Sequence, residues 1–132
     1  MEAVFFCKNF KIYFPNEHMF IIFVKNIDMI TAITAKDNKK EAQLDERFGR
    51  CPYFAIYDHS TASTEFIENP YKDDQGGVGT RVVELLANKE VTQVVASEFG
   101  PKAKGLLEQL KIQLIVPNEL NQTVNKIIQK LN

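Results

Sequence analysis

The second half of the chain alternates between segments of helical period and short β-branched apolar runs, and this alternation limits the possible folds. Apolar side chains recur at helical spacing over Val78–Asn88, Pro101–Leu110 and Leu120–Leu131, which predicts three helices. Val91–Ser97 and Lys111–Pro117 are short apolar runs rich in Val and Ile, and they predict two strands. Because a helix connects these two strands, we expect them to run parallel, joined by a right-handed connection.

Three further strands are predicted before the first helix. They cover Met29–Ala35, Pro52–Asp58 and Thr61–Glu68, and the tight turn between the last two predicts an antiparallel pair. Polar stretches over 36–49 and 69–77 are predicted to be loops. The element order is therefore β-β-β-α-β-α-β-α. We predict an α/β fold with a mixed five-stranded sheet and helices on its faces.

Residues 1–28, the N-terminal extension, are rich in phenylalanine, since they hold six of the ten in the chain. Their longest apolar run, Met19–Val24, has six residues. A membrane-spanning helix needs about 20. Polar residues also interrupt any signal-peptide core, and no small-residue cleavage site follows. We therefore expect neither a membrane anchor nor a signal peptide.

Two interpretations of the N-terminal extension stay open. It is either an accessory hairpin, with strands at 3–14 and 19–25 and a turn at Pro15-Asn16, or a leader that the native protein lacks. The second interpretation is favoured because a self-sufficient domain, 29–132, begins at Met29.

Charge and motif content argue against several classes of function. The chain has 16 basic and 17 acidic residues, so its net charge of -1 argues against a broad nucleic-acid-binding surface. Cys7 and Cys51 form no CxxC motif, which argues against a disulfide framework or a zinc site and favours a reducing, cytoplasmic location. The element order resembles that of ribonuclease H, but the first and fourth predicted strands carry no acidic residue. With no HExxH or nucleophile-elbow motif either, we predict that the chain is not an enzyme.

Ligands of open α/β sheets bind beyond the carboxyl ends of parallel strands. If the first and fourth predicted strands are neighbours, residues 34–37 and 97–100 meet at one rim, and the loop over 73–79 can reach it. The glycines of this loop would let the backbone approach an anion at a helix start, while its threonine and arginine would add a hydroxyl and a charge. The alternative is a flexible loop before a helix. The candidate residues are Gly76, Gly77, Gly79, Thr80 and Arg81.

A second group of candidates is Arg47, Arg50 and Cys51. Arginines beside a cysteine favour its thiolate, the form that binds soft metals, so Cys51 is a candidate metal ligand. The alternative is that Cys51 is a small buried hydrophobe and the arginines are solvated. On these residues alone, the alternative is favoured.

Three segments carry a resemblance to a known family: 45–54 (DERFGRCPYF), 76–79 (GGVG) and 99–103 (FGPKA). With them, Met29–Asn132 resembles the dinitrogenase iron–molybdenum cofactor biosynthesis family, which includes NifX, NafY and the C-terminal domain of NifB. The resemblance implies a ribonuclease H-like fold without nuclease activity. It also implies the binding or carrying of iron–sulfur or iron–molybdenum clusters during cofactor assembly, in a small stand-alone member.

The leading hypothesis joins both groups of candidates into one site. A non-catalytic carrier or scaffold would transiently bind an anionic metal–sulfur cluster or its precursor, with Cys51 as the single covalent ligand. Its partners would be proteins that donate or accept such clusters, with no role for nucleic acid or membrane. The alternatives are a metal-free adaptor module for a P-loop ATPase of cluster assembly and a sensor of small oxyanions or nucleotides.

Overall fold

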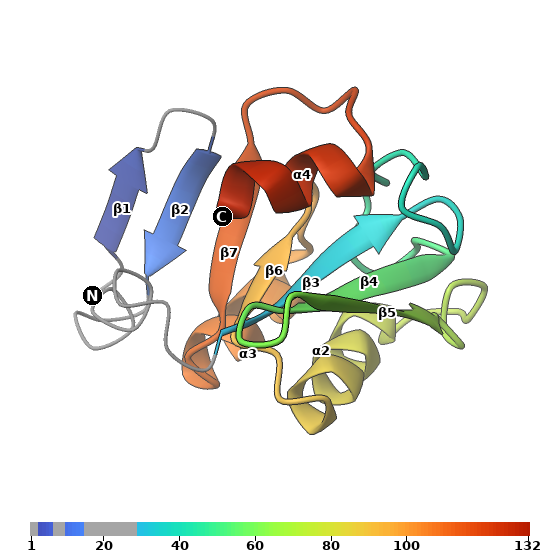
Figure 1. Cartoon of the computed structure of the whole chain (residues 1–132). Helices are drawn as coiled ribbons and strands as arrows, with labels where there is room; N and C mark the ends of the chain where they lie inside the picture. The colour runs from blue at the N-terminus through green and yellow to red at the C-terminus, as the bar shows by residue number, and fades with distance from the viewer. Residues whose placement is uncertain (1–2, 7–9, 15–28) are drawn as a thin grey trace.

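The computed structural model describes residues 3–6, 10–14 and 29–132, and they form one twisted sheet with helices on both faces (Figure 1). The sheet order is β1-β2-β7-β6-β3-β4-β5. Within these residues, no helix is long and apolar enough to cross a membrane. The strands are β1 (Ala3–Phe6), β2 (Phe10–Phe14), β3 (Ile30–Ala35), β4 (Tyr53–Asp58), β5 (Ser63–Glu68), β6 (Gln93–Val95) and β7 (Gln113–Pro117). The helices are α2 (Val78–Asn88), α3 (Pro101–Gln109) and α4 (Val124–Leu131).

The α/β fold and its mixed five-stranded sheet are confirmed for the region after residue 28. β3 pairs parallel with β6, and β6 pairs parallel with β7, whereas β4 pairs antiparallel with both β3 and β5. Numbered from β3, the strands lie in the spatial order 5-4-1-2-3. The first and fourth predicted strands are thus neighbours, which brings their carboxyl ends to one rim of the sheet.

Several elements are shorter than predicted, because loops take over hydrogen bonds that the sheet or helix would otherwise use. β6 ends at Val95, since the backbone N–H groups of Ser97 and Glu98 donate to the Glu46 carbonyl rather than to a neighbouring strand. α4 begins at Val124 because the extended residue Thr123 caps it and accepts from the Lys126 N–H.

The N-terminal extension adds two strands that the five-stranded prediction did not include. β1 and β2 form an antiparallel hairpin, and β2 pairs antiparallel with β7, so the sheet has seven strands. The single strand predicted over 3–14 is therefore wrong, because Ala3–Phe6 and Phe10–Phe14 are separate strands that pair antiparallel with each other. The predicted turn at Pro15-Asn16 and the predicted strand at 19–25 lie outside the described residues.

Two apolar layers, one on each face of the sheet, form the core. α2 and α3 cover one face, where Val82 and Leu86 of α2 and Leu107 of α3 are fully buried. α4 covers the other face through Ile127 and Val124 (Figure 1). Consecutive residues of a strand point to opposite faces, so β3 contributes to both layers. This layering leaves the N-termini of α2 and α3 at the rim of the sheet where β3 and β6 end.

A row of polar side chains lies at the opposite end of the parallel strands. The Gln93 amide donates to the Thr31 hydroxyl, which hydrogen-bonds His59 Nε2 at 2.8 Å. Thr31 and Gln93 are fully buried, and His59 is half-buried with its ring 4.7 Å from that of Tyr57. Burial lowers the pKa of His59, and the Asp58 carboxylate only partly offsets this effect.

We expect this histidine to make folding sensitive to mild acid. Because the pKa of His59 is lower in the folded chain than the unfolded value of about 6.5, the unfolded state binds the proton more readily below that pH. The contribution of neutral His59 to the free energy of unfolding is complete above the unfolded pKa and is lost as the pH falls below that value. Denaturant titrations at pH 7.5 and 5.5 should show this loss, and His59→Gln should reduce it. An equal loss in the variant would contradict the assignment.

A second prediction concerns the outer edge of β7. A chain that begins at Met29 lacks β2, so the backbone groups of β7 that pair with residues 10–13 lose their partners. Unpaired strand edges template association. We expect a lower melting temperature and concentration-dependent self-association, measured by thermal unfolding and analytical ultracentrifugation. A monomeric, equally stable truncated chain would show that the hairpin is dispensable to the fold.

Candidate functional site

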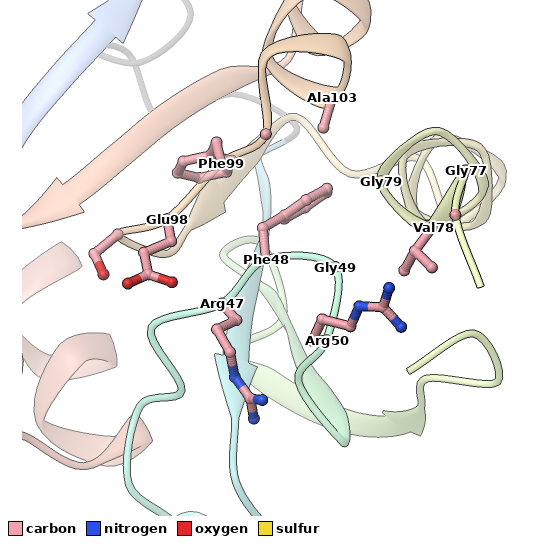
Figure 2. Close-up of a pocket in the computed structure, with 13 residues that line it drawn as sticks. Arg47, Phe48, Gly49, Arg50, Gly77, Val78, Gly79, Glu98, Phe99 and Ala103 are labelled. Carbon is pink, nitrogen blue, oxygen red and sulfur yellow. The ribbon is translucent and has the colours of Figure 1, made fainter. Parts of the chain in front are cut away.

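A cleft of about 700 Å³ opens at the rim where β3 and β6 end. Three segments line it: the loop 47–50, the start of α2 with the glycines before it (76–79), and the connection 97–100 that leads into α3, with Ala103 behind it. Figure 2 shows these segments converging from separate parts of the fold. The topology therefore places in one cleft most of the segments that the sequence pointed to.

The loop 47–50 is fixed to the end of β6 by its backbone and by one aromatic side chain. The Phe48 N–H donates to the Glu98 carbonyl at 3.0 Å, and the Glu46 carbonyl accepts from the Glu98 N–H at 2.8 Å. The Phe48 ring is buried and lies 5.2 Å from the ring of Phe99. The loop is thus a rigid wall of the cleft, with an apolar base beneath its backbone.

Two helix N-termini face the cleft, and neither is capped by a side chain. α2 begins after Gly77, which has a left-handed backbone (φ 66°), and α3 begins after Gly100. In the described residues, no hydrogen-bond partner is found for the backbone N–H groups of the first residues in these helices. These groups are Val78, Gly79 and Thr80 in α2, and Lys102 and Ala103 in α3.

The start of α4 provides an internal comparison. There the Val124 N–H donates to the Ala42 carbonyl, the Asn125 N–H to the Lys40 carbonyl, and the Lys126 N–H to the Thr123 hydroxyl. Uncapped N–H groups and the helix dipole attract anions. The two helices that face the cleft retain this capacity, whereas α4 has used it internally.

Close packing between the walls requires glycine at two positions. A Cβ atom on Gly79 would lie 3.0 Å from the Ala103 Cβ, so glycine lets the starts of α2 and α3 approach each other. A Cβ atom on Gly49 would lie 3.2 Å from the Val78 side chain, so glycine also lets the loop approach α2. The small residues thus set the width of the cleft.

The three predicted arginines differ in how their charges are balanced. Arg47 forms a two-point ion pair with the buried Asp45 carboxylate, with N–O distances of 2.9 and 3.1 Å. Burial opposes ionisation of Asp45, but the hydrogen bonds from Arg47 outweigh it and lower the Asp45 pKa. Arg81 pairs with Asp74 at 2.7 Å.

Arg50 has neutral partners instead. Its Nη1 donates to the backbone carbonyls of Lys72 and Asp74, at 2.9 and 2.6 Å. Among the described residues, no carboxylate pairs with its guanidinium. Its side chain points toward Val78, which lines the same cleft (Figure 2). Of the three arginines, Arg50 brings the least compensated positive charge to the cleft.

Cys51 does not have the environment that the sequence suggested. Its side chain is fully buried in the layer beneath α2 and α3, and it does not line the cleft. Burial raises the pKa of the thiol, with a further contribution from the Asp45 carboxylate, and the charge of Arg47 is too weak to reverse this shift. The expectation that neighbouring arginines favour a thiolate is therefore wrong. The alternative, a small buried hydrophobe, describes Cys51 as the structure places it.

The other predicted residues divide between lining the cleft and supporting it. Gly76, Gly77 and Gly79 line it together with Arg47 and Arg50. Thr80 and Arg81 do not line the cleft. The Thr80 hydroxyl donates to the Gly77 carbonyl, and the Arg81 guanidinium lies 5.9 Å from the Tyr71 ring centre. Sequence reasoning did not assign a role to Phe48, Phe99, Ala103 or Glu98. The FGPKA segment holds two of them, but only the close packing of α3 on α2 shows why they matter.

A family model described as dinitrogenase iron–molybdenum cofactor matches residues 29–132. The chain belongs to this family. An uncharacterized protein from Methanocaldococcus jannaschii is 34% identical over 79 residues, which are 58% of this chain and 67% of that protein. The family resemblance inferred from the sequence is thus confirmed, and it covers all the segments that form the cleft.

Two solved structures are similar to this member of the dinitrogenase iron–molybdenum cofactor family. The apo form of the orange protein from Desulfovibrio gigas has a TM-score of 0.72 and 26% identity, over 78% of this chain and 86% of that protein. A protein from Thermotoga provisionally named NifB has a TM-score of 0.65 and 30% identity, over 76% of this chain and 84% of that protein. Both support the same fold for this chain.

The left-handed glycine before α2 allows a test of the site geometry by stability. Gly77→Ala forces a left-handed alanine, which costs about 1–2 kcal/mol. Gly105→Ala is the matched control, because Gly105 lies inside α3 with nothing within 4 Å of its added Cβ. Alanine is favoured over glycine there by about 0.5–1 kcal/mol. Denaturant midpoints should therefore move in opposite directions. A neutral Gly77→Ala would contradict the left-handed cap.

Proposed function

We propose that this chain is a non-catalytic carrier or scaffold for an anionic metal–sulfur cluster or a precursor of one, held in the cleft between the loop 47–50 and the starts of α2 and α3. Membership of the dinitrogenase iron–molybdenum cofactor family supports a role in handling such clusters. The cargo binds and leaves without a chemical change made by this chain.

One observation carries the proposal: two uncapped helix N-termini converge on one cleft with Arg50, whose guanidinium pairs with no carboxylate of the described residues. The backbone N–H groups of Val78, Gly79 and Ala103, which line the cleft, and the Arg50 guanidinium are all donors, and charge-assisted hydrogen bonds to an anion are among the stronger ones in proteins. Among the described residues that line the cleft, Glu98 is the one carboxylate. The balance of donors therefore favours an anion.

The shape of the cleft suits a sulfur-rich anion. Val78, Phe99 and Ala103 give it an apolar side, and polar donors stand at the rim. Sulfide is a weaker hydrogen-bond acceptor than oxygen, and a bulky sulfide-covered cluster can use apolar contacts that a strongly hydrated oxyanion cannot. This supports a metal–sulfur cargo over a simple oxyanion.

The proposed binding is noncovalent. The described residues hold no group of three or more His, Cys, Asp or Glu side chains that could ligate a metal ion, and Cys51 is buried away from the cleft. Hydrogen bonds and charge then hold the cargo, which favours loading and release over storage. The partners we propose are cluster donors and acceptors, including an assembly ATPase of the P-loop type.

Arg50 provides the sharpest test of this proposal. Anaerobic titration with tetrathiomolybdate, and reconstitution with iron, sulfide and molybdate, should each produce bound charge-transfer absorbance in the wild-type chain. Losing one charge-assisted hydrogen bond costs about 1.5 kcal/mol or more, which weakens binding about tenfold. We expect this weakening in Arg50→Gln. In Arg50→Lys the charge remains, so we expect a smaller loss.

Lys126→Gln is the matched control, because it removes the same charge from the exposed surface of α4, on the other face of the sheet. Its affinity should equal that of the wild type. If Arg50→Gln binds as tightly as Lys126→Gln, the proposed cleft is wrong. If the wild type takes up no metal at all, the proposal fails in favour of a metal-free adaptor, which a pull-down of its partner would then reveal.

A further inference from the structure

We infer that Asn69 is a positioning residue, which fixes the two loops of the cleft relative to each other and so determines how tightly the cleft holds an anion. The part that concerns affinity rests on the proposed function. The part that concerns geometry does not, because it follows from contacts of Asn69 alone.

Asn69 directly follows β5 and is 1% exposed. Its side-chain Nδ2 donates to the carbonyls of Gly49 and Cys51, both at 2.9 Å, and its Oδ1 accepts from the Tyr71 N–H at 3.0 Å. Its own backbone N–H donates to the Pro52 carbonyl at 2.9 Å. One buried amide thus joins the loop that contains Gly49 and Arg50 to the loop that leads toward α2.

A second connection lies outside this buried one. Arg50 holds the carbonyls of Lys72 and Asp74, and the Asp74 N–H donates to the Tyr71 carbonyl at 3.1 Å. The loop from Asn69 to Asp74 is therefore fixed at its buried end by Asn69 and at its exposed end by Arg50. The chain reaches the cleft-lining residues Gly76 and Gly77 shortly afterwards. A change at Asn69 therefore affects two of the three segments that line the cleft.

The chemistry at this position is specific to asparagine. Its planar amide supplies two donors and one acceptor in a fixed arrangement, and all three are used. Aspartate has the same shape but no donors, and its carboxylate would face two carbonyl oxygens. Alanine would leave the buried Cys51 carbonyl and the half-buried Gly49 carbonyl and Tyr71 N–H without these partners, and leaving a buried group unpaired costs more than the hydrogen bond itself.

A general loss of stability must be separated from a loss of position, and Gln122 allows this. It is another buried amide, 3% exposed, that donates to the Glu119 carbonyl and accepts from Lys130 Nζ at 2.9 Å. It precedes α4 on the other face of the sheet. Gln122→Ala therefore removes a comparable buried amide without touching either loop of the cleft.

The experiment compares Asn69→Ala and Gln122→Ala in two measurements below their melting temperatures. Amide hydrogen exchange should rise at least about tenfold over residues 47–51 and 70–80 in Asn69→Ala, which loses three side-chain hydrogen bonds there, and only near α4 in Gln122→Ala. Affinity for tetrathiomolybdate should fall about tenfold in Asn69→Ala and stay unchanged in Gln122→Ala. If Asn69→Ala does not fold, Asn69→Ser replaces it, with the same direction of change expected.

Two results would overturn the inference: wild-type exchange over 70–80 in the Asn69 variant, or an equal loss of affinity in Gln122→Ala. Failure of the proposed function gives a different experimental result from failure of this inference. In that case the wild type does not bind tetrathiomolybdate, and the exchange measurement still decides whether Asn69 positions the loops.

Discussion

The carbonyl of Glu46 accepts hydrogen bonds from the N–H groups of both Ser97 and Glu98, and the candidate site depends on this double contact. These two N–H groups are turned away from the neighbouring strands, so β6 stops at Val95 and the chain continues toward α3. The reciprocal bond from the Phe48 N–H to the Glu98 carbonyl fixes the loop in turn. The end of the parallel strands therefore opens into a cleft, with rigid backbone on both sides.

The distribution of satisfied and unsatisfied groups sets the cleft apart from the rest of the molecule. α4 begins on a threonine cap with carbonyls from another loop within reach, whereas α2 and α3 begin on glycines that offer no side chain. Arg47 and Arg81 pair with buried or half-buried carboxylates, whereas Arg50 pairs with no carboxylate in the part of the chain that the structure describes. Local rules of capping and charge pairing are followed elsewhere and relaxed at the cleft, which is a pattern expected of a functional site.

The fold was largely predictable from the sequence, because the period of apolar residues after Met29 distinguishes helix from strand at each step. The ends of the helices and strands were not predictable in the same way. β6, for example, ends where it does because a loop from elsewhere in the fold accepts its next hydrogen bonds. The rim of the candidate site followed from the parallel topology, and the three predicted glycines line the cleft at that rim. The charge balance of Arg47, Arg50 and Arg81 could not be predicted from the sequence, since it depends on which carboxylate each guanidinium reaches in the fold. The sequence placed Asn69 only in a predicted loop, because the partners of its side-chain amide group lie on another loop, about twenty residues away.

The position of Cys51 has a consequence for the proposed carrier. Its sulfur packs in the core, and its backbone carbonyl accepts from Asn69, so Cys51 supports the cleft by volume and by its main chain. A cargo held by N–H donors and one arginine depends on its own charge for retention, and each donor contributes a modest free energy. An acceptor protein that offers thiolates forms much stronger bonds to the same metal. In the proposed carrier, the stronger bonds of the acceptor would therefore set the direction of transfer.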